Sequence, residues 1–146
     1  MKIQILNNKL IQILVSSFLM GLSQHPLNLG FLSWISLIPF IHILNSVNCY
    51  KKIIFYSFSW GLLYNLFTVF WLAFNIGTAP LIAFISMLLA ILILSSSAIL
   101  VGILWFRLSK FYSKNKLLLF PLVWVSIEYI RSYGILGFPW ISLANS

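Results

Sequence analysis

The sequence predicts an all-α fold, a multi-pass bundle of about five transmembrane helices with a cytoplasmic N-terminus. Of the 146 residues, 62% are apolar, and a single acidic residue stands against nine Lys and Arg. No charged residue occurs from Ile53 to Phe106, a stretch long enough for two bilayer crossings of roughly 20 residues each. A soluble domain of this size cannot hide so much apolar surface from water.

Five apolar runs, separated by polar or Pro- and Gly-containing stretches, are the predicted helices. They cover residues 10–22, 29–47, 53–74, 80–106 and 117–133. The first follows two lysines, as a cleaved signal peptide would, but no convincing cleavage site comes after it, so an uncleaved helix is favoured. The fourth would be roughly 40 Å long as a helix and should tilt or protrude. Residues 1–146 are expected to form a single transmembrane domain.

The positions of the basic residues predict the orientation. Every second loop is basic, whereas the loops around His25 and Gly77 carry no Lys or Arg. Lys and Arg accumulate on the cytoplasmic side of membrane proteins, so the C-terminal end is expected on the outer face. The basic loop residues are Lys2, Lys9, Lys51, Lys52, Arg107, Lys110, Lys114 and Lys116. Because these charges lie between apolar runs, nucleic-acid binding is not expected.

Small residues four apart predict where helices approach each other closely. The pairs are Ser57/Gly61, Ser86/Ala90 and Ala98/Gly102. The pair Ser57/Gly61, on the third predicted helix, belongs to a longer stripe of residues on one face. This stripe is either a helix interface, which is the favoured interpretation, or the lining of a substrate groove. The stripe comprises Ser57, Gly61, Tyr64, Thr68 and Trp71.

Glu128 and Arg131 are the candidate intramembrane charges. Their side chains lie three residues apart on the fifth predicted helix and can meet on one face. Charges at this depth are costly unless they are paired or face a wet cavity. We expect a structural charge pair; contact with substrate or a lipid headgroup, or direct chemistry by Glu128, are the alternatives.

The glycines and proline of the segment 134–140 end this helix and predict a turn at the outer membrane face. Phe138, Pro139 and Trp140 are the candidate lipid- or substrate-contacting residues, since aromatic rings settle at that interface. His25, His42 and Cys49 stand apart, without the spacing of a metal site or a catalytic set. We therefore expect no metal, no cofactor and no catalytic residue in these 146 residues.

One long motif closely resembles apolipoprotein N-acyltransferases, in which a W-x3-E-x2-R helix end leads into a GFPW turn. Here it reads Trp124-Val-Ser-Ile-Glu128-Tyr-Ile-Arg131-Ser-Tyr-Gly134-Ile-Leu-Gly137-Phe138-Pro139-Trp140. Weaker matches in the same order cover His25-Pro26-Leu27 to Pro39 and Trp60-Gly61 to Pro80, so the resemblance spans essentially the whole chain.

The resemblance implies the membrane part of a bacterial inner-membrane enzyme that moves an acyl chain from a phospholipid to the N-terminal cysteine of a lipoprotein. Membrane phospholipids and lipoprotein precursors are then the expected partners. The family's nitrilase-like catalytic domain uses a Glu-Lys-Cys triad and a thioester intermediate. No residue here matches that triad, so we expect a truncated or split enzyme, inactive alone, with a separately encoded nitrilase-like domain as a further partner. A small membrane binding or transport module, and a structural membrane subunit, are the alternatives.

Overall fold

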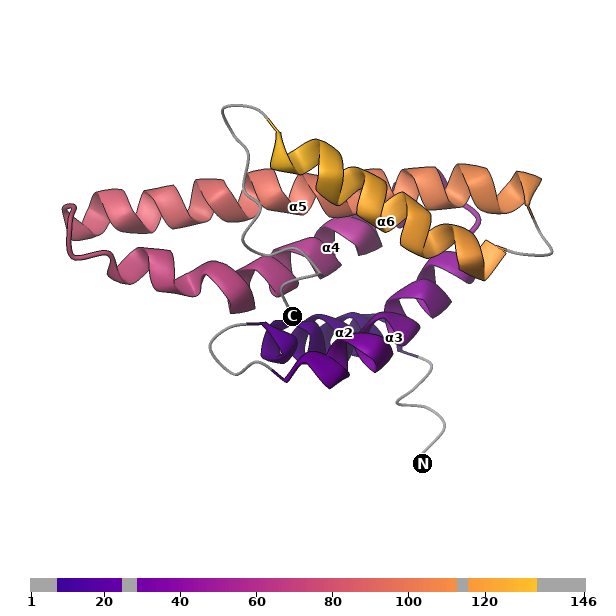
Figure 1. The fold of residues 1–146 in the computed structure, drawn as a ribbon, viewed down its shortest axis with the longest axis horizontal. Helices are drawn as coiled ribbons and strands as arrows, with labels where there is room; N and C mark the ends of the chain where they lie inside the picture. Colours follow the sequence, from indigo (N-terminus) through magenta and orange to yellow (C-terminus); the bar gives the residue numbers. More distant parts are fainter. Residues whose placement is uncertain (1–7, 25–28, 113–115, 134–146) are drawn as a thin grey trace.

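All regular structure in the part of the chain that the structure describes is helical. The computed structural model describes residues 8–24, 29–112 and 116–133 (Figure 1). Its α-helices are α2 (Lys9–Ser23), α3 (Ser33–Asn45), α4 (Tyr50–Val69), α5 (Pro80–Phe111) and α6 (Lys116–Ser132). Two 3-10 segments, η1 (Gly30–Leu32) and η2 (Phe70–Phe74), precede α3 and follow α4. The predicted fold class, an all-α bundle of five helices, is confirmed.

The helices differ in whether they can cross a bilayer. Tyr50–Phe74, with 25 residues, and Pro80–Phe111, with 32, are long and apolar enough to span a membrane. With 15 and 13 residues, α2 and α3 are only about 22 and 20 Å long, shorter than a hydrocarbon core of about 30 Å. A separate crossing by each of the five helices, and the orientation of the bundle, stay predictions.

The two long helices form the spine of the bundle. In Figure 1, α4 and α5 lie side by side along the long axis of the molecule and run in opposite directions. The α2–α3 hairpin packs against α4, and α6 packs on α5. The three consecutive helices α4, α5 and α6 thereby surround one region, which holds the site described below.

Small residues set the distance between α4 and α5, as the sequence predicted. A Cβ atom added to Gly61 would lie 2.9 Å from the Cβ of Ala98 and 3.1 Å from the Cα of Ser95, and one added to Gly102 would overlap the Ser57 hydroxyl. The α4 stripe is therefore chiefly a helix interface. Ser57, Gly61, Tyr64 and Thr68 are buried along it, whereas Trp71, on η2, is 44% exposed.

A chain of polar contacts fixes the α2–α3 hairpin to α4. The Trp60 indole N–H donates to the Ser16 hydroxyl at 2.8 Å, and that hydroxyl donates to the Ser36 carbonyl at 2.5 Å. The Trp60 ring also stacks on Phe40 of α3, with 4.7 Å between ring centroids. Because Trp60 and both serines are fully buried, these bonds define how the hairpin docks.

Candidate functional site

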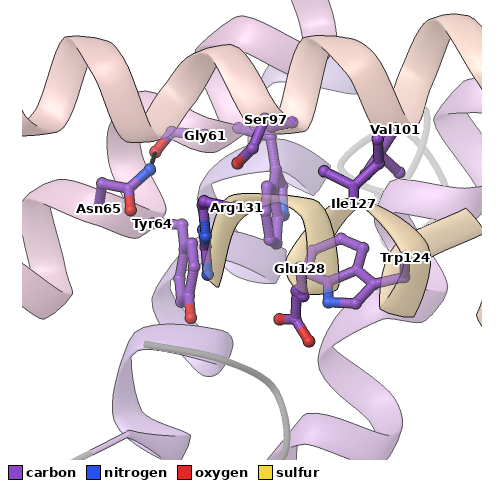
Figure 2. A pocket seen from close by; sticks show the side chains of 11 residues that line it. Gly61, Tyr64, Asn65, Ser97, Val101, Trp124, Ile127, Glu128 and Arg131 are labelled. Atoms are coloured by element: carbon purple, nitrogen blue, oxygen red, sulfur yellow. Dashed lines mark hydrogen bonds between the residues drawn. The ribbon is translucent and has the colours of Figure 1, made fainter. Parts of the chain in front are cut away.

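A small cavity lies between α4, α5 and α6. Its volume is about 20 Å³, and Figure 2 shows it from close by. This is the volume open to the centre of a water-sized sphere, and about 10–15 Å³ of it is enough for one water molecule. The cavity therefore has room for about one water. The lining comprises Trp60, Gly61, Tyr64 and Asn65 of α4, Ser97, Ala98 and Val101 of α5, and Trp124, Ile127, Glu128 and Arg131 of α6.

Both candidate charges of the sequence lie in this lining. Glu128 and Arg131 lie on neighbouring turns of α6, and the Arg131 side chain lies beside the Tyr64 ring of α4 (Figure 2). Both charges act electrostatically on Tyr64, which is only 5% exposed. The two residues thus belong to one site. Direct pairing between the carboxylate and the guanidinium stays a prediction.

The cavity wall carries two buried polar atoms that need a partner. Asn65 donates its amide N–H to the Gly61 carbonyl at 2.7 Å and to the Ser95 hydroxyl at 3.4 Å. The Asn65 Oδ1 atom and the Trp124 Nε1 atom have no hydrogen-bond partner among the described residues. Leaving a buried donor or acceptor unsatisfied costs about 1–3 kcal/mol, so the cavity favours a polar guest.

Three aromatic rings, those of Trp60, Tyr64 and Trp124, belong to the cavity wall and pack against one another. Trp60 stacks on Tyr64 with 5.1 Å between centroids and meets Trp124 edge to face at 5.6 Å. Phe120 lies next to Trp124 at 5.8 Å. Aromatic pairs of this kind contribute about 0.5–1.5 kcal/mol beyond the area that they bury. The polar groups are therefore held in a fixed, largely apolar frame.

The remaining sequence candidates are not brought to this cavity. His42 contacts Gln12 through its Nδ1 atom at 3.1 Å, and Cys49 is an exposed free thiol before α4. Hydrogen bonds from the backbone N–H groups of Lys51 and Lys52 hold the pKa of the Cys49 thiol below its ordinary value, and the charges of both lysines add to this effect. The predicted contact residues Phe138, Pro139 and Trp140, and also His25, lie outside the described residues.

Sequence reasoning did not connect Asn65 and Trp60 to the two charges. The available signal is that Asn65 is a polar residue within the apolar run 53–74. The position of Asn65 along the bundle axis relative to Glu128 depends on how α4 and α6 are tilted. A single sequence does not determine these tilts.

The described fold and site define a class: an α-helical bundle with two membrane-length helices and a polar cavity that holds a Glu and an Arg of one helix. Comparison with known proteins narrows this class. The family described as "Apolipoprotein N-acyltransferase N-terminal domain" matches residues 16–146. The chain belongs to this family. Its motif from Trp124 onward, and with it both cavity charges, falls inside the match.

A curated relative agrees with this assignment. The chain is similar to the apolipoprotein N-acyltransferase of Pasteurella multocida (strain Pm70), with 25% identity over 100 residues. The aligned part is 66% of this chain and 18% of the relative, so the match spans about a fifth of that protein's length. No solved structure matches the chain.

Proposed function

We propose that this chain is the membrane part of an apolipoprotein N-acyltransferase, which transfers an acyl chain from a phospholipid to the N-terminal cysteine of a lipoprotein. The observation that carries the proposal is the family match over residues 16–146, which includes the helix bearing Glu128 and Arg131. A membrane bundle suits this reaction because the acyl donor and the acceptor are both lipids that can approach through the bilayer.

The 146 residues are proposed not to perform the transfer by themselves. A thioester mechanism needs a nucleophilic thiolate and a positioned acid or base. The single thiol, Cys49, precedes α4, whereas the single carboxylate, Glu128, lines the cavity on α6. We propose that the bundle lies in the inner membrane with its N-terminus in the cytoplasm. The acyl transfer itself is then carried out by a nitrilase-like domain in the periplasm.

A chimera tests this function. Residues 16–146 would replace the corresponding segment of the Pasteurella multocida relative in cells depleted of their own N-acyltransferase. We expect the chimera to restore N-acylation of lipoproteins, measured by mass spectrometry of their N-terminal peptides, and the 146-residue chain alone to restore none. A chimera that is inserted at normal levels but inactive would refute the proposal. Activity of the 146-residue chain alone would refute the placement of the chemistry.

Reporter fusions test the proposed orientation separately. A periplasm-active phosphatase joined after Ser146 should be active, and the same reporter joined at Lys114 should be silent. The opposite pattern would overturn the orientation without touching the family assignment.

A small membrane module that binds or transports an unrelated substrate is less well supported. The cavity between α4, α5 and α6 has room for about one water molecule, and α5 runs without interruption from Pro80 to Phe111. Transporters instead build their midplane sites from broken helices.

A further inference from the structure

The cavity is not the only concentration of charge in the described residues. A second one lies where α4 begins and α5 ends, at the same end of the bundle (Figure 1). We call it the basic–aromatic cluster, and its members are Tyr50, Lys51 and Lys52 of α4 and Phe106, Arg107 and Lys110 of α5.

Direct contacts join the two helices within this cluster. The Arg107 Nε–H group donates to the Tyr50 hydroxyl at 3.4 Å, and the Tyr50 ring meets Phe106 edge to face at 4.7 Å. The Lys110 ammonium lies 4.1 Å from the centroid of the Phe106 ring. The ring contacts place the Arg107 and Lys110 charges beside the first turn of α4, which carries Lys51 and Lys52.

Four cations therefore gather at one end of the bundle without an acidic neighbour. The chain has a single acidic residue, Glu128, and it lies on α6 about 18 Å from the start of that helix. All four basic side chains are exposed. The partial positive charge at the N-terminus of α4 adds to theirs. The charge that balances them must come from outside the described residues.

The surface next to the cations indicates what supplies that charge. Ile54 and Phe55, on the second turn of α4, are 39% and 56% exposed, and Phe111 beside Lys110 is 82% exposed. An anionic phospholipid offers a phosphate for the cations and an acyl chain for this apolar surface. An acidic soluble protein would satisfy only the first requirement. Tyr and basic side chains are also typical of the headgroup level of a bilayer.

We propose that the basic–aromatic cluster is a binding site for the headgroup of an anionic phospholipid. The Arg107 guanidinium, oriented by the Tyr50 hydroxyl, and the Lys110 ammonium bind the phosphate oxygens, and the charges of Lys51 and Lys52 on the first turn of α4 add to the local positive potential. This site goes beyond the proposed acyl transfer and does not depend on it. The proposed orientation places it in the cytoplasmic leaflet.

Lipid titration of the 146-residue chain tests the site. The protein in neutral detergent is titrated with phosphatidylglycerol or phosphatidylcholine, and bound lipid is counted by native mass spectrometry at low ionic strength. We expect tighter binding of phosphatidylglycerol. A surface cation contributes about 1 kcal/mol to such binding, so R107Q should weaken it about fivefold, and R107K should retain most of it. Binding of phosphatidylcholine should not change.

The matched control is K9Q, which removes the same net charge outside the cluster. Lys9 is a half-buried residue of α2; its ammonium donates to the Ser46 carbonyl at 3.5 Å and lies 5.7 Å from the centroid of the Tyr56 ring. Equal weakening by K9Q and R107Q would mean diffuse attraction to a positive surface and would overturn the site. Equal affinity of the wild type for phosphatidylglycerol and phosphatidylcholine would also overturn the site. This result is expected if an acidic protein is the natural occupant. Circular dichroism and gel filtration of R107Q exclude misfolding.

Cys49 supplies a second, local readout, since it directly precedes Tyr50. A bound phosphate would oppose ionisation of this thiol, so added phosphatidylglycerol should slow its alkylation by neutral iodoacetamide at fixed pH. The slowing should be smaller in R107Q and unchanged in K9Q. An alkylation rate that does not respond to phosphatidylglycerol in the wild type would contradict headgroup binding at this position.

Discussion

Replacing Gly61 by alanine probes a close approach of α4 to α5. The added Cβ would lie 2.9 Å from the Ala98 Cβ and 3.1 and 3.2 Å from the Cα and carbonyl oxygen of Ser95. Carbon atoms at optimal separation are about 3.5–4.0 Å apart. Two of the three obstructing atoms belong to the α5 backbone, which rotamer changes cannot move. The helices must therefore separate by several tenths of an ångström.

The magnitude follows from two opposing effects. Overpacking costs about 1–3 kcal/mol, and the backbone obstruction favours the upper part of this range. Alanine in place of glycine within a helix recovers up to about 1 kcal/mol. We expect Gly61→Ala to lower the free energy of unfolding by about 2 kcal/mol and to widen the neighbouring cavity, which Gly61 and Ala98 both line.

Thermal unfolding in a fixed detergent is the assay, with Gly77→Ala as the matched control. A Cβ added to Gly77, in the exposed turn before α5, would meet only the Asn75 Oδ1 atom at 3.4 Å, so this variant should unfold like the wild type. Adding Ala98→Gly to Gly61→Ala should recover part of the loss, because it removes the 2.9 Å contact. A Gly61→Ala protein as stable as the wild type would refute the tight α4–α5 packing.

Three further predictions concern the charges, the hairpin and the thiol. Glu128→Gln should reduce the amount of inserted protein, measured by immunoblotting of membranes, and a second change, Arg131→Gln, should restore it; equal amounts in all variants would exclude pairing. Trp60→Phe should lower the free energy of unfolding by about 1–3 kcal/mol, because the buried Ser16 hydroxyl loses its donor, and the effect should shrink in a Ser16→Ala background. The rate of Cys49 alkylation should rise with pH with a midpoint below that of an ordinary cysteine, because the lowered pKa of this thiol gives thiolate at lower pH. A midpoint at or above the ordinary value would contradict this effect.

The sequence was sufficient for the helices and for the close contact of α4 and α5. Hydrophobic runs bounded by charges and prolines gave element positions to within a few residues, because burial in lipid or in a bundle selects continuous apolar stretches. The run ending at Phe106 continues as helix to Phe111, since Arg107 and Lys110 can stay helical while their charges reach water. The spacing of Ser57 and Gly61 gave the packing face.

The composition of the cavity could not be predicted in the same way. That Glu128 and Arg131 share a face follows from helical spacing alone. Their meeting with Tyr64 and Asn65 depends on the relative heights of α4 and α6. Those heights are set by side-chain contacts such as Trp60 against Trp124. The short length of α3 was also missed, because the apolar run over 29–47 contains both η1 and α3, whereas the predicted run over 10–22 agrees closely with α2.

The two concentrations of charge act on the bundle in different ways. Ala98, in the cavity wall, and Arg107, in the basic–aromatic cluster, are separated along α5 by about 14 Å of helix, more than the roughly 10 Å Debye length at ordinary ionic strength. The exposed cluster responds to salt and to anionic lipid at the membrane surface, whereas the charges in the cavity are partly shielded from both. High salt should therefore weaken lipid binding at Arg107 while leaving the energetics of Glu128 and Arg131 nearly unchanged, since screening by salt is strong only for exposed charges.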